Sequence, residues 1–134
     1  MRGFIVLADF AEAVGGKLYI MGGGWSTLNL VVPADISVAG IVYVPWDEAN
    51  RRRRLLLQLL TEDGDEVRFD GAPVEMRGEF EVGRPPGITP GVELELPVAA
   101  RFNNLPLTPG RYKFSLTVGA THVSDVKFEV RPGV

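Results

Sequence analysis

The chain has no cysteine, and this absence excludes disulfides, thiolate nucleophiles and zinc sites built on cysteine. Histidine is almost as scarce, since His122 is the only one in 134 residues. Long apolar runs are lacking too: after Arg2, the stretch 4–8 is followed by Asp9 and Glu12, which makes it too short for a signal peptide or a membrane span. We therefore expect a cytoplasmic protein with no metal, no cofactor and no membrane contact.

The composition is that of one globular domain covering residues 1–134. Hydrophobic residues make up 46% of the chain and charged residues 23%, which is enough apolar surface to build one core. The net charge of -3 gives no general attraction to phosphate backbones, so we expect no nucleic-acid partner. Sixteen glycines and ten prolines divide the sequence into short apolar segments, which is typical of many strands joined by turns.

The first third of the chain predicts three strands. Residues 3–10 are rich in β-branched and aromatic residues, and a turn at 14–17 leads into a second strand running from Leu18 toward Leu28. These two strands read as a hairpin. Residues 34–44 alternate in polarity and predict a third strand, which Pro45 ends because proline cannot donate to a ladder.

Segment 47–60 is compatible with a helix or with a strand, because it is rich in arginine and leucine. The strand is favoured by apolar residues at every second position, Leu55, Leu57 and Leu59. An Asp-Gly turn at 63–64 then predicts a hairpin, with Val67 and Phe69 on the returning strand.

The remaining segments also alternate in polarity. Residues 76–82 form one such segment, and in residues 92–102 the inward side chains are expected to be Val92, Leu94 and Leu96. Tyr112 follows the turn at 109–110 in a pattern that resembles the tyrosine corner of immunoglobulin-like and fibronectin-type sandwiches. The predicted fold is therefore all-β, a single Greek-key, immunoglobulin-like, antiparallel β-sandwich.

No set of residues predicts catalysis. Ser124, His122 and Asp125 have the residue types of a hydrolase triad, but residues so close on one turn or strand cannot reach the triad geometry. Glu93 and Glu95 share a strand face at a spacing that would suit acid and base roles in glycoside hydrolysis. No apolar pocket is evident that would raise the pKa of one of them, so a solvated face is the better interpretation.

The most unusual local feature is the glycine run before Trp25, which consists of Gly22, Gly23 and Gly24. Glycines inside a strand weaken it and are typical of a bulge or a close approach by another group. We expect a bulge that lets Trp25 enter the core, with a surface groove at the same place as the alternative. Asp9 shares a strand face with Ile5 and Leu7, so its carboxylate is expected to accept hydrogen bonds from backbone N–H groups near the glycines.

The arginine run 51–54 is the one strongly basic stretch. It has no interleaved aromatic platform for RNA, and the acidic residues at 62–66 predict local charge pairing. On a strand, Leu56 and Leu60 would lie on the less buried face, where two leucines among polar positions indicate a covering segment or a partner.

The segments 8–12 and 16–25 resemble the N-terminal pattern of an uncharacterised bacterial family known from actinobacteria among others, and the residues at 45–50 and 59–64 fit the same pattern. The most specific part is the stretch Gly-Lys-Leu-Tyr-Ile-Met-Gly-Gly-Gly-Trp. The resemblance covers most of the chain and implies a small, all-β bacterial protein of unknown function. It carries no functional residues that could be transferred.

Taken together, the sequence predicts a non-enzymatic module that binds another protein or itself, as a homo-oligomer. The residues predicted to bind the partner or ligand are Asp9, Gly22, Gly23, Gly24, Trp25, Trp46, Arg52, Arg54, Leu56 and Leu60. One alternative is a small-ligand module, for carbohydrate as an example, that stacks its ligand on Trp25 or Trp46. A carboxylate-dependent hydrolase is the third possibility, and it requires two carboxylates that converge in a cleft.

Overall fold

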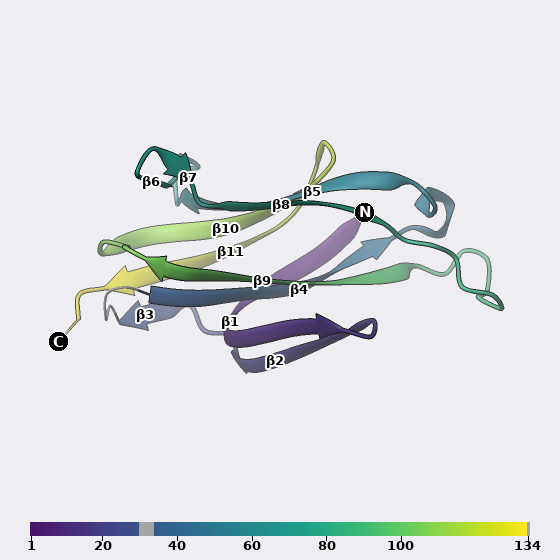
Figure 1. Ribbon diagram of the computed structural model, residues 1–134, viewed down its shortest axis with the longest axis horizontal. Coiled ribbons are helices and arrows are strands. Elements are labelled where there is room, and N and C mark those ends of the chain that lie inside the picture. The colour runs from purple at the N-terminus through teal and green to yellow at the C-terminus, as the bar shows by residue number, and fades with distance from the viewer. Residues whose placement is uncertain (30–33, 134) are drawn as a thin grey trace.

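Two packed layers of strands form the protein, and the computed structural model describes residues 1–29 and 34–133 (Figure 1). The first sheet has the order β2–β1–β4–β9, formed by Lys17–Gly23, Arg2–Val14, Ala34–Val44 and Leu94–Leu105. The second has the order β3–β11–β10–β5–β8, formed by Thr27–Asn29, Thr121–Arg131, Gly110–Val118, Arg52–Thr61 and Glu75–Glu81. The smaller elements are the hairpin of β6, Arg68–Phe69, with β7, Ala72–Pro73, and the 3-10 turn η1, Trp46–Glu48. The predicted all-β sandwich is confirmed.

Strand β5 is formed by the segment that was compatible with a helix. Leu55, Leu57 and Leu59 are buried, whereas Arg54 and Leu56 lie on the opposite face, so the two-residue period decides which side chains enter the core. The strand lies between β10 and β8, and both of its edges are therefore hydrogen-bonded over most of its length. The strand interpretation is confirmed.

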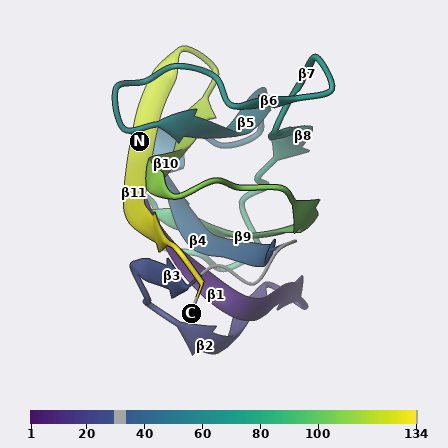
Figure 2. The ribbon, with the colours of Figure 1, turned by 90° about the vertical axis from the view of Figure 1, so that its left-hand side faces the viewer.

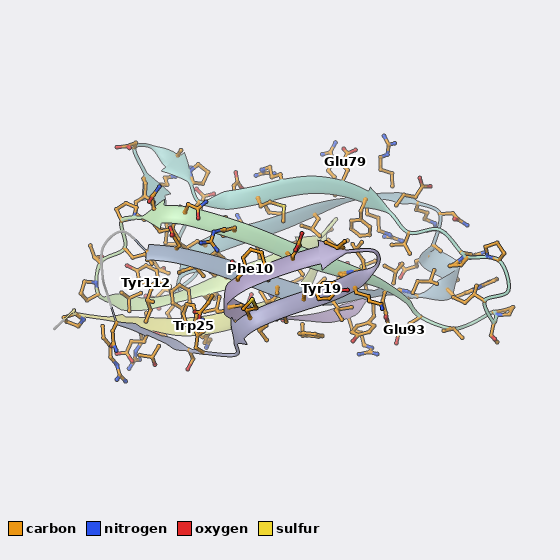
Figure 3. All side chains as sticks on the ribbon, turned by 60° about the horizontal axis from the view of Figure 1, so that its bottom comes forward. Phe10, Tyr19, Trp25, Glu79, Glu93 and Tyr112 are labelled. Atoms are coloured by element: carbon orange, nitrogen blue, oxygen red, sulfur yellow. The ribbon has the colours of Figure 1, made fainter. Side chains whose placement is uncertain are left out.

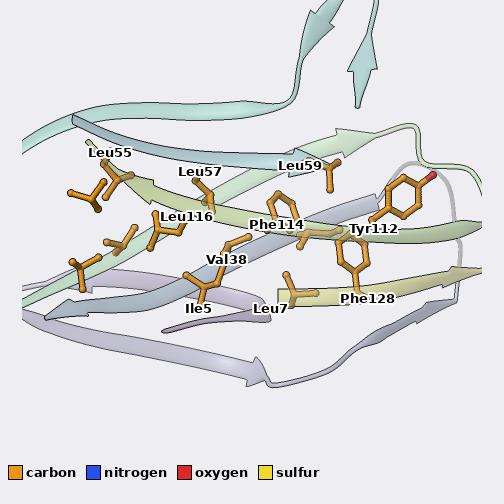
Figure 4. Packing of buried hydrophobic residues seen from close by; sticks show 14 of the residues in the cluster. Ile5, Leu7, Val38, Leu55, Leu57, Leu59, Tyr112, Phe114, Leu116 and Phe128 are labelled. Atoms are coloured by element: carbon orange, nitrogen blue, oxygen red, sulfur yellow. The ribbon is translucent and has the colours of Figure 1, made fainter. Parts of the chain in front are cut away.

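The core lies between the two sheets and takes alternate side chains from both (Figure 4). Leu57 of β5, Phe114 of β10 and Val38 of β4 are almost fully buried there. The rings of Phe114 and Phe128 stack with centroids 5.7 Å apart. Burying one such side chain stabilises the fold by about 1.5–3 kcal/mol.

The predicted tyrosine corner is present at the start of β10. The hydroxyl of Tyr112 donates a hydrogen bond of 2.8 Å to the backbone carbonyl of Thr108. The ring of Tyr112 also stacks on Phe128, with centroids 5.7 Å apart, so the corner is attached to the core.

The prediction of one strand from Leu18 toward Leu28 is wrong. The chain leaves β2 at Gly23 and crosses to the second sheet, where β3 pairs in parallel with β11. The physical reason lies in the glycine run: Gly22 and Gly24 have φ values of 61° and 90°, a left-handed backbone that turns the chain away from β1. The sandwich is antiparallel in every other pairing of the described strands.

The predicted Asp-Gly turn is found after β5, but its returning strand was assigned wrongly. Gly64 has a φ of 94°, and its N–H donates to the Thr61 carbonyl at 2.9 Å. The strand that pairs with β5 along residues 52–58 is β8, so Val67 reaches only the end of β5 and Phe69 pairs within the β6–β7 hairpin.

The inward position predicted for Val92 is also wrong. Strand β9 begins two residues later, at Leu94, which is buried, whereas Val92 lies in a preceding turn and is 45% exposed. Because Val92 lies outside the strand, the alternation of side chains that turns Leu94 inward does not apply to it.

Candidate functional site

The β1–β2 hairpin is built on a two-glycine turn. Gly15 and Gly16 have φ values of 59° and 75°, the positive values that a type I′ turn requires at both positions. The flanking residues Val14 and Lys17 form the first pair of the ladder, and the register continues to Phe10 opposite Met21. The hairpin predicted around 14–17 is therefore confirmed.

The hairpin belongs to the first sheet but bends over the outer face of that sheet. The first half of β1 pairs with β4, but after Ala8 the strand bends, and β1 and β2 then lie on the side of β4 and β9 that faces away from β5 and β10 (Figure 2). Arg101 of β9 donates to the carbonyl of Asp9 at 3.2 Å. Beneath the hairpin, Ser37 and Ala39 are 0% exposed although they lie on the face of β4 opposite the core. Small side chains at these positions let the hairpin approach closely.

Large apolar side chains gather on the outward face of the hairpin, which they share with Glu12 and Lys17. They alternate along both strands, on the face opposite Leu18, and Figure 3 labels Phe10 and Tyr19 on it. We define the hairpin surface as these four side chains: Phe10, 43% exposed; Val14, 51%; Tyr19, 53%; and Met21, 67%. An outward strand face is normally polar, so this gathering indicates a surface that a partner covers.

The hairpin surface was not predicted from the sequence, although a signal was present. Leu18 and Ile20 are apolar on the inner face of β2, and Tyr19 and Met21 are apolar on the outer face. A strand that is apolar on both faces, next to a two-residue turn, indicates a hairpin that needs cover on both sides.

Asp9 does not take the position predicted for it. Because β1 bends after Ala8, Asp9 leaves the face of Ile5 and Leu7 and is exposed, so a half-buried carboxylate bound by backbone N–H groups is wrong. Its carboxylate instead occupies the space beside the Cα of Gly22, where any side chain on that residue would collide with it. The structure thus brings Asp9 and Gly22 together, but their contact is steric and is not the predicted hydrogen bond.

The bulge expected at the glycine run is not found, because the β1–β2 register continues to Gly23 without a shift; the chain then leaves the ladder, and Trp25 packs against the core. The N–H of Gly24 donates to the Leu7 carbonyl at 2.8 Å, which anchors the turn to β1. Trp25 is half-buried and packs edge-on against Phe128, with centroids 6.4 Å apart. Gly23 is held close to Ile20, whose side chain fills the space beside its Cα.

Trp46 lies apart from these residues, in η1. The guanidinium of Arg84 stacks over its ring at 3.7 Å from the centroid and also donates to the Trp46 carbonyl at 2.7 Å. One face of the indole is therefore covered by a cation–π contact within the chain. The structure does not bring Trp46 and Trp25 into one site.

The predicted residues of β5 share the outer face of the second sheet. Arg54 and Leu56 line a hollow of about 550 Å³, which we call the arginine hollow. Its other lining residues are Leu55, Arg77, Gly78, Glu79, Thr117 and Gly119. Arg52 lies beside it, joined to Glu79 at 3.8 Å, and Leu60 lies further along the same strand. Among the described residues, Arg54 forms no ion pair.

The charge pairing predicted between 51–54 and 62–66 is wrong. Arg53 pairs with Glu48 at 3.5 Å, and Glu62 pairs with Arg111 at 3.7 Å. The reason is topological: β8, and not the segment after the Asp-Gly turn, lies beside this part of β5.

His122 and Asp125 form a local cluster on β11. The imidazole Nε2 lies 2.7 Å from Oδ1 of Asp125, and Lys113 lies 3.7 Å from the other carboxylate oxygen. Partial burial raises the pKa of Asp125, but hydrogen bonds from His122 and Ser115 outweigh it, so the net pKa is lowered. The serine at this carboxylate is Ser115 and not the Ser124 of the triad pattern, and among the described residues no hydrogen bond joins the Ser124 side chain to His122.

The carboxylates at 93 and 95 both line a hollow of about 370 Å³. Glu93 is joined to Arg2 by an exposed ion pair of 2.9 Å, and this hydrogen bond raises the pKa of Arg2. Glu95 is exposed as well. The same hollow is also lined by Val82, Pro85, Ile88 and Leu94, but both carboxylates are exposed to solvent.

Two other kinds of feature are absent from residues 1–29 and 34–133. No three His, Asp or Glu side chains come together there in a way that could hold a metal ion. Within the same residues, no helix has the length and apolar character needed to cross a membrane.

Comparison with known proteins gives one family. A family model described as a family of unknown function, DUF6941, matches residues 3–131. No curated protein matches the chain.

Proposed function

The chain belongs to the family of unknown function DUF6941, and we propose that it is a non-enzymatic domain that binds another protein, or a second copy of itself, through the hairpin surface. The observation that carries this proposal is the gathering of the four large apolar side chains on one outward face. Removing apolar surface from water contributes about 25 cal/mol for each Å², from which the entropy cost of association is subtracted.

The layered construction of the hairpin supports the same function. Ser37 and Ala39 of β4 are fully buried although they face away from the core, and Arg101 ties the hairpin backbone to β9. The outer face is therefore presented on a supported element, and little conformational entropy is lost when a partner binds.

Capture from an extract of the source organism tests this function. The bait is the tagged chain, and the matched control bait carries Tyr19→Ser and Met21→Ser. Both side chains are more than half exposed, so the two baits should melt at the same temperature by circular dichroism. We expect the wild-type bait to retain its own untagged chain or another protein, and the control bait to retain about tenfold less, which corresponds to 1.4 kcal/mol. Equal retention by both baits would contradict the proposal.

A second candidate function is favoured by the convergence of Arg54 and Leu56 on the arginine hollow. The unpaired guanidinium of Arg54 could bind a carboxylate of a partner segment, and the neighbouring Leu56 could contact an aliphatic side chain next to that carboxylate. A labelled peptide of alternating glutamate and leucine is the probe, and Arg54→Gln should abolish its binding. Arg111→Gln, on the same sheet face but paired with Glu62, is the control that should retain binding. Absence of a saturable, salt-sensitive anisotropy change would remove this candidate.

The carbohydrate alternative has less support. A stacking platform needs a free aromatic face, whereas Trp46 is covered by Arg84 on one face and Trp25 packs against Phe128.

The strand order supports an immunoglobulin-like assignment within the sandwich. The strands β1, β4 and β9 take the order A–B–E, and β11, β10, β5 and β8 take the order G–F–C–C′ of variable-type domains. Tyr112, at the start of the strand in the F position, is where a tyrosine corner belongs. We also propose, from the sequence, a cytoplasmic protein of bacterial origin without enzymatic activity.

A further inference from the structure

We infer that the partner at the hairpin is a second copy of this chain, and that the two copies pair their β2 strands antiparallel about a two-fold axis at Ile20. This inference rests on the proposed function, names the partner, and places the contact at the β2 edge of the hairpin surface, where Tyr19 and Met21 lie. It joins the two hairpins into one four-stranded layer.

The first observation is an unprotected edge. In the strand order of the described residues β2 is the last strand of its sheet, and every one of its residues except Leu18 is exposed. Edge strands are normally protected from pairing by charges, by proline or by covering segments. β2 contains no proline, and Lys17 at its start is its only charged residue.

The second observation concerns the backbone groups on that edge. In an antiparallel ladder, hydrogen-bonded pairs alternate with non-hydrogen-bonded pairs. The type I′ turn makes Val14–Lys17 a hydrogen-bonded pair, so Tyr19 and Met21 also bond to β1. The N–H and C=O groups of Leu18 and Ile20 therefore point to the free edge, where Ile20 can exchange two hydrogen bonds with Ile20 of the second copy.

The third observation is that the strand is complementary to itself about this residue. Ile20 is the midpoint of Lys17–Gly23, so a two-fold axis there places the two strands in full overlap, with the left-handed Gly22 opposite Leu18 of the second copy. Tyr19 then lies opposite Met21 of the second copy on the outward face. These are the two most exposed members of the hairpin surface, and a thioether beside an aromatic ring is a favourable contact.

The charges of the two strands do not oppose the pairing. Lys17, the only charged residue of β2, would lie opposite Gly23 of the second copy. The two lysines lie at opposite ends of the paired strands, about 20 Å apart at 3.3 Å for each of six residues, so like charges do not meet.

The absence of cysteine makes a cross-linking experiment specific, because an introduced thiol has only its symmetry mate to react with. Ile20→Cys would bring two Cα atoms to about 5.5 Å, within the range that a disulfide spans. Lys17→Cys is the matched control, since its two copies are about 20 Å apart. Under mild oxidation we expect a covalent dimer from Ile20→Cys and none from Lys17→Cys.

Molecular mass in solution provides the second measurement. Light scattering on the wild-type chain should give twice the chain mass of 14.6 kDa. Ile20→Pro removes an N–H that points away from β1, and Met21→Lys places a charge on an exposed side chain, so both should fold and both should give the mass of one chain.

The outcomes separate this inference from the proposed function. A wild-type chain that stays monomeric at the highest attainable concentration overturns the inference, yet capture of another protein that depends on Tyr19 and Met21 would leave the proposed function standing. A wild-type dimer in which Lys17→Cys cross-links as readily as Ile20→Cys overturns the two-fold axis at Ile20. Equal retention by the two capture baits overturns the proposed function itself.

Discussion

The carboxylate of Asp9 occupies the space into which a side chain on Gly22 would project. The two residues lie where β1 has bent away from β4 and where β2 is about to leave β1. Gly22 also has a φ of 61°, so its backbone and its surroundings both favour glycine. This contact lies at the open end of the hairpin, where β1 enters it and β2 leaves it. It therefore helps to set the orientation of the hairpin surface.

Gly22→Ala should therefore lower the free energy of unfolding by about 1–3 kcal/mol, through left-handed strain and the collision with Asp9. In an Asp9→Ala background the same change should be less harmful, because only the backbone strain remains. Urea unfolding of the four chains gives the coupling as a double-mutant cycle. A cost of Gly22→Ala that is the same in both backgrounds would show that the carboxylate plays no part.

Tyr112→Phe removes the hydrogen bond from the tyrosine hydroxyl to the Thr108 carbonyl and leaves the ring stack on Phe128 intact. We expect a loss of about 1 kcal/mol in the free energy of unfolding. Chemical denaturation measures it, and the slope with denaturant should not change. An unaltered midpoint would mean that water replaces the bond at no cost.

Gly78→Ala and Gly40→Ala should have opposite effects. A Cβ on Gly78 meets open space, so alanine there should be neutral or stabilise the strand by about 0.5–1 kcal/mol. A Cβ on Gly40 would collide with the Phe4 carbonyl and lie 2.8 Å from a methyl of Ile5, so alanine there should lower stability by about 1–3 kcal/mol. Thermal melts of the two variants check this, and a Gly40→Ala chain as stable as the wild type would contradict the packing of β1 on β4.

Asp125→Asn tests the His122–Asp125 cluster through pH. The pKa of Asp125 is lowered on folding, so the carboxylate contributes stability above its ordinary pKa of about 3.9, and this contribution is lost as the pH falls through the lowered value. For a surface cluster the contribution is about 1 kcal/mol or less. The difference in unfolding free energy between wild type and variant should therefore shrink as the pH is lowered from 6 to about 2. A difference that stays constant over this range would exclude the linkage.

The fold followed from the sequence to the extent that local chemistry determines it. Alternating leucines at 55, 57 and 59, the Gly15-Gly16 turn and the Tyr112 corner each depend on residues close together in the chain, and all three were predicted correctly. The partner of β5 and the path after Gly23 depend on which distant strand occupies an edge, and both were predicted wrongly.

For the candidate site too, features that depend on neighbouring residues were predicted correctly, and features that depend on distant residues were not. The sequence placed Arg54 and Leu56 on one face of one strand, and they do line one hollow. It also placed Asp9 on the core face, because the period of two was continued through a bend that only the packing of the hairpin on Ser37 and Ala39 requires. For the same reason the outward face of Phe10, Tyr19 and Met21 was not foreseen.

The sequence by itself determined the class of fold, the turns and the side chains of each strand that share a face, because these depend on intrinsic backbone preference and on a two-residue period. Only the tertiary structure decided which of those faces remains uncovered. Tyr19 and Leu18 are adjacent and both apolar, and one faces solvent while the other faces the sheet because the bend after Ala8 laid the hairpin on β4 and β9. Burial is a property of what packs against a residue, and residues distant in the chain supply that packing.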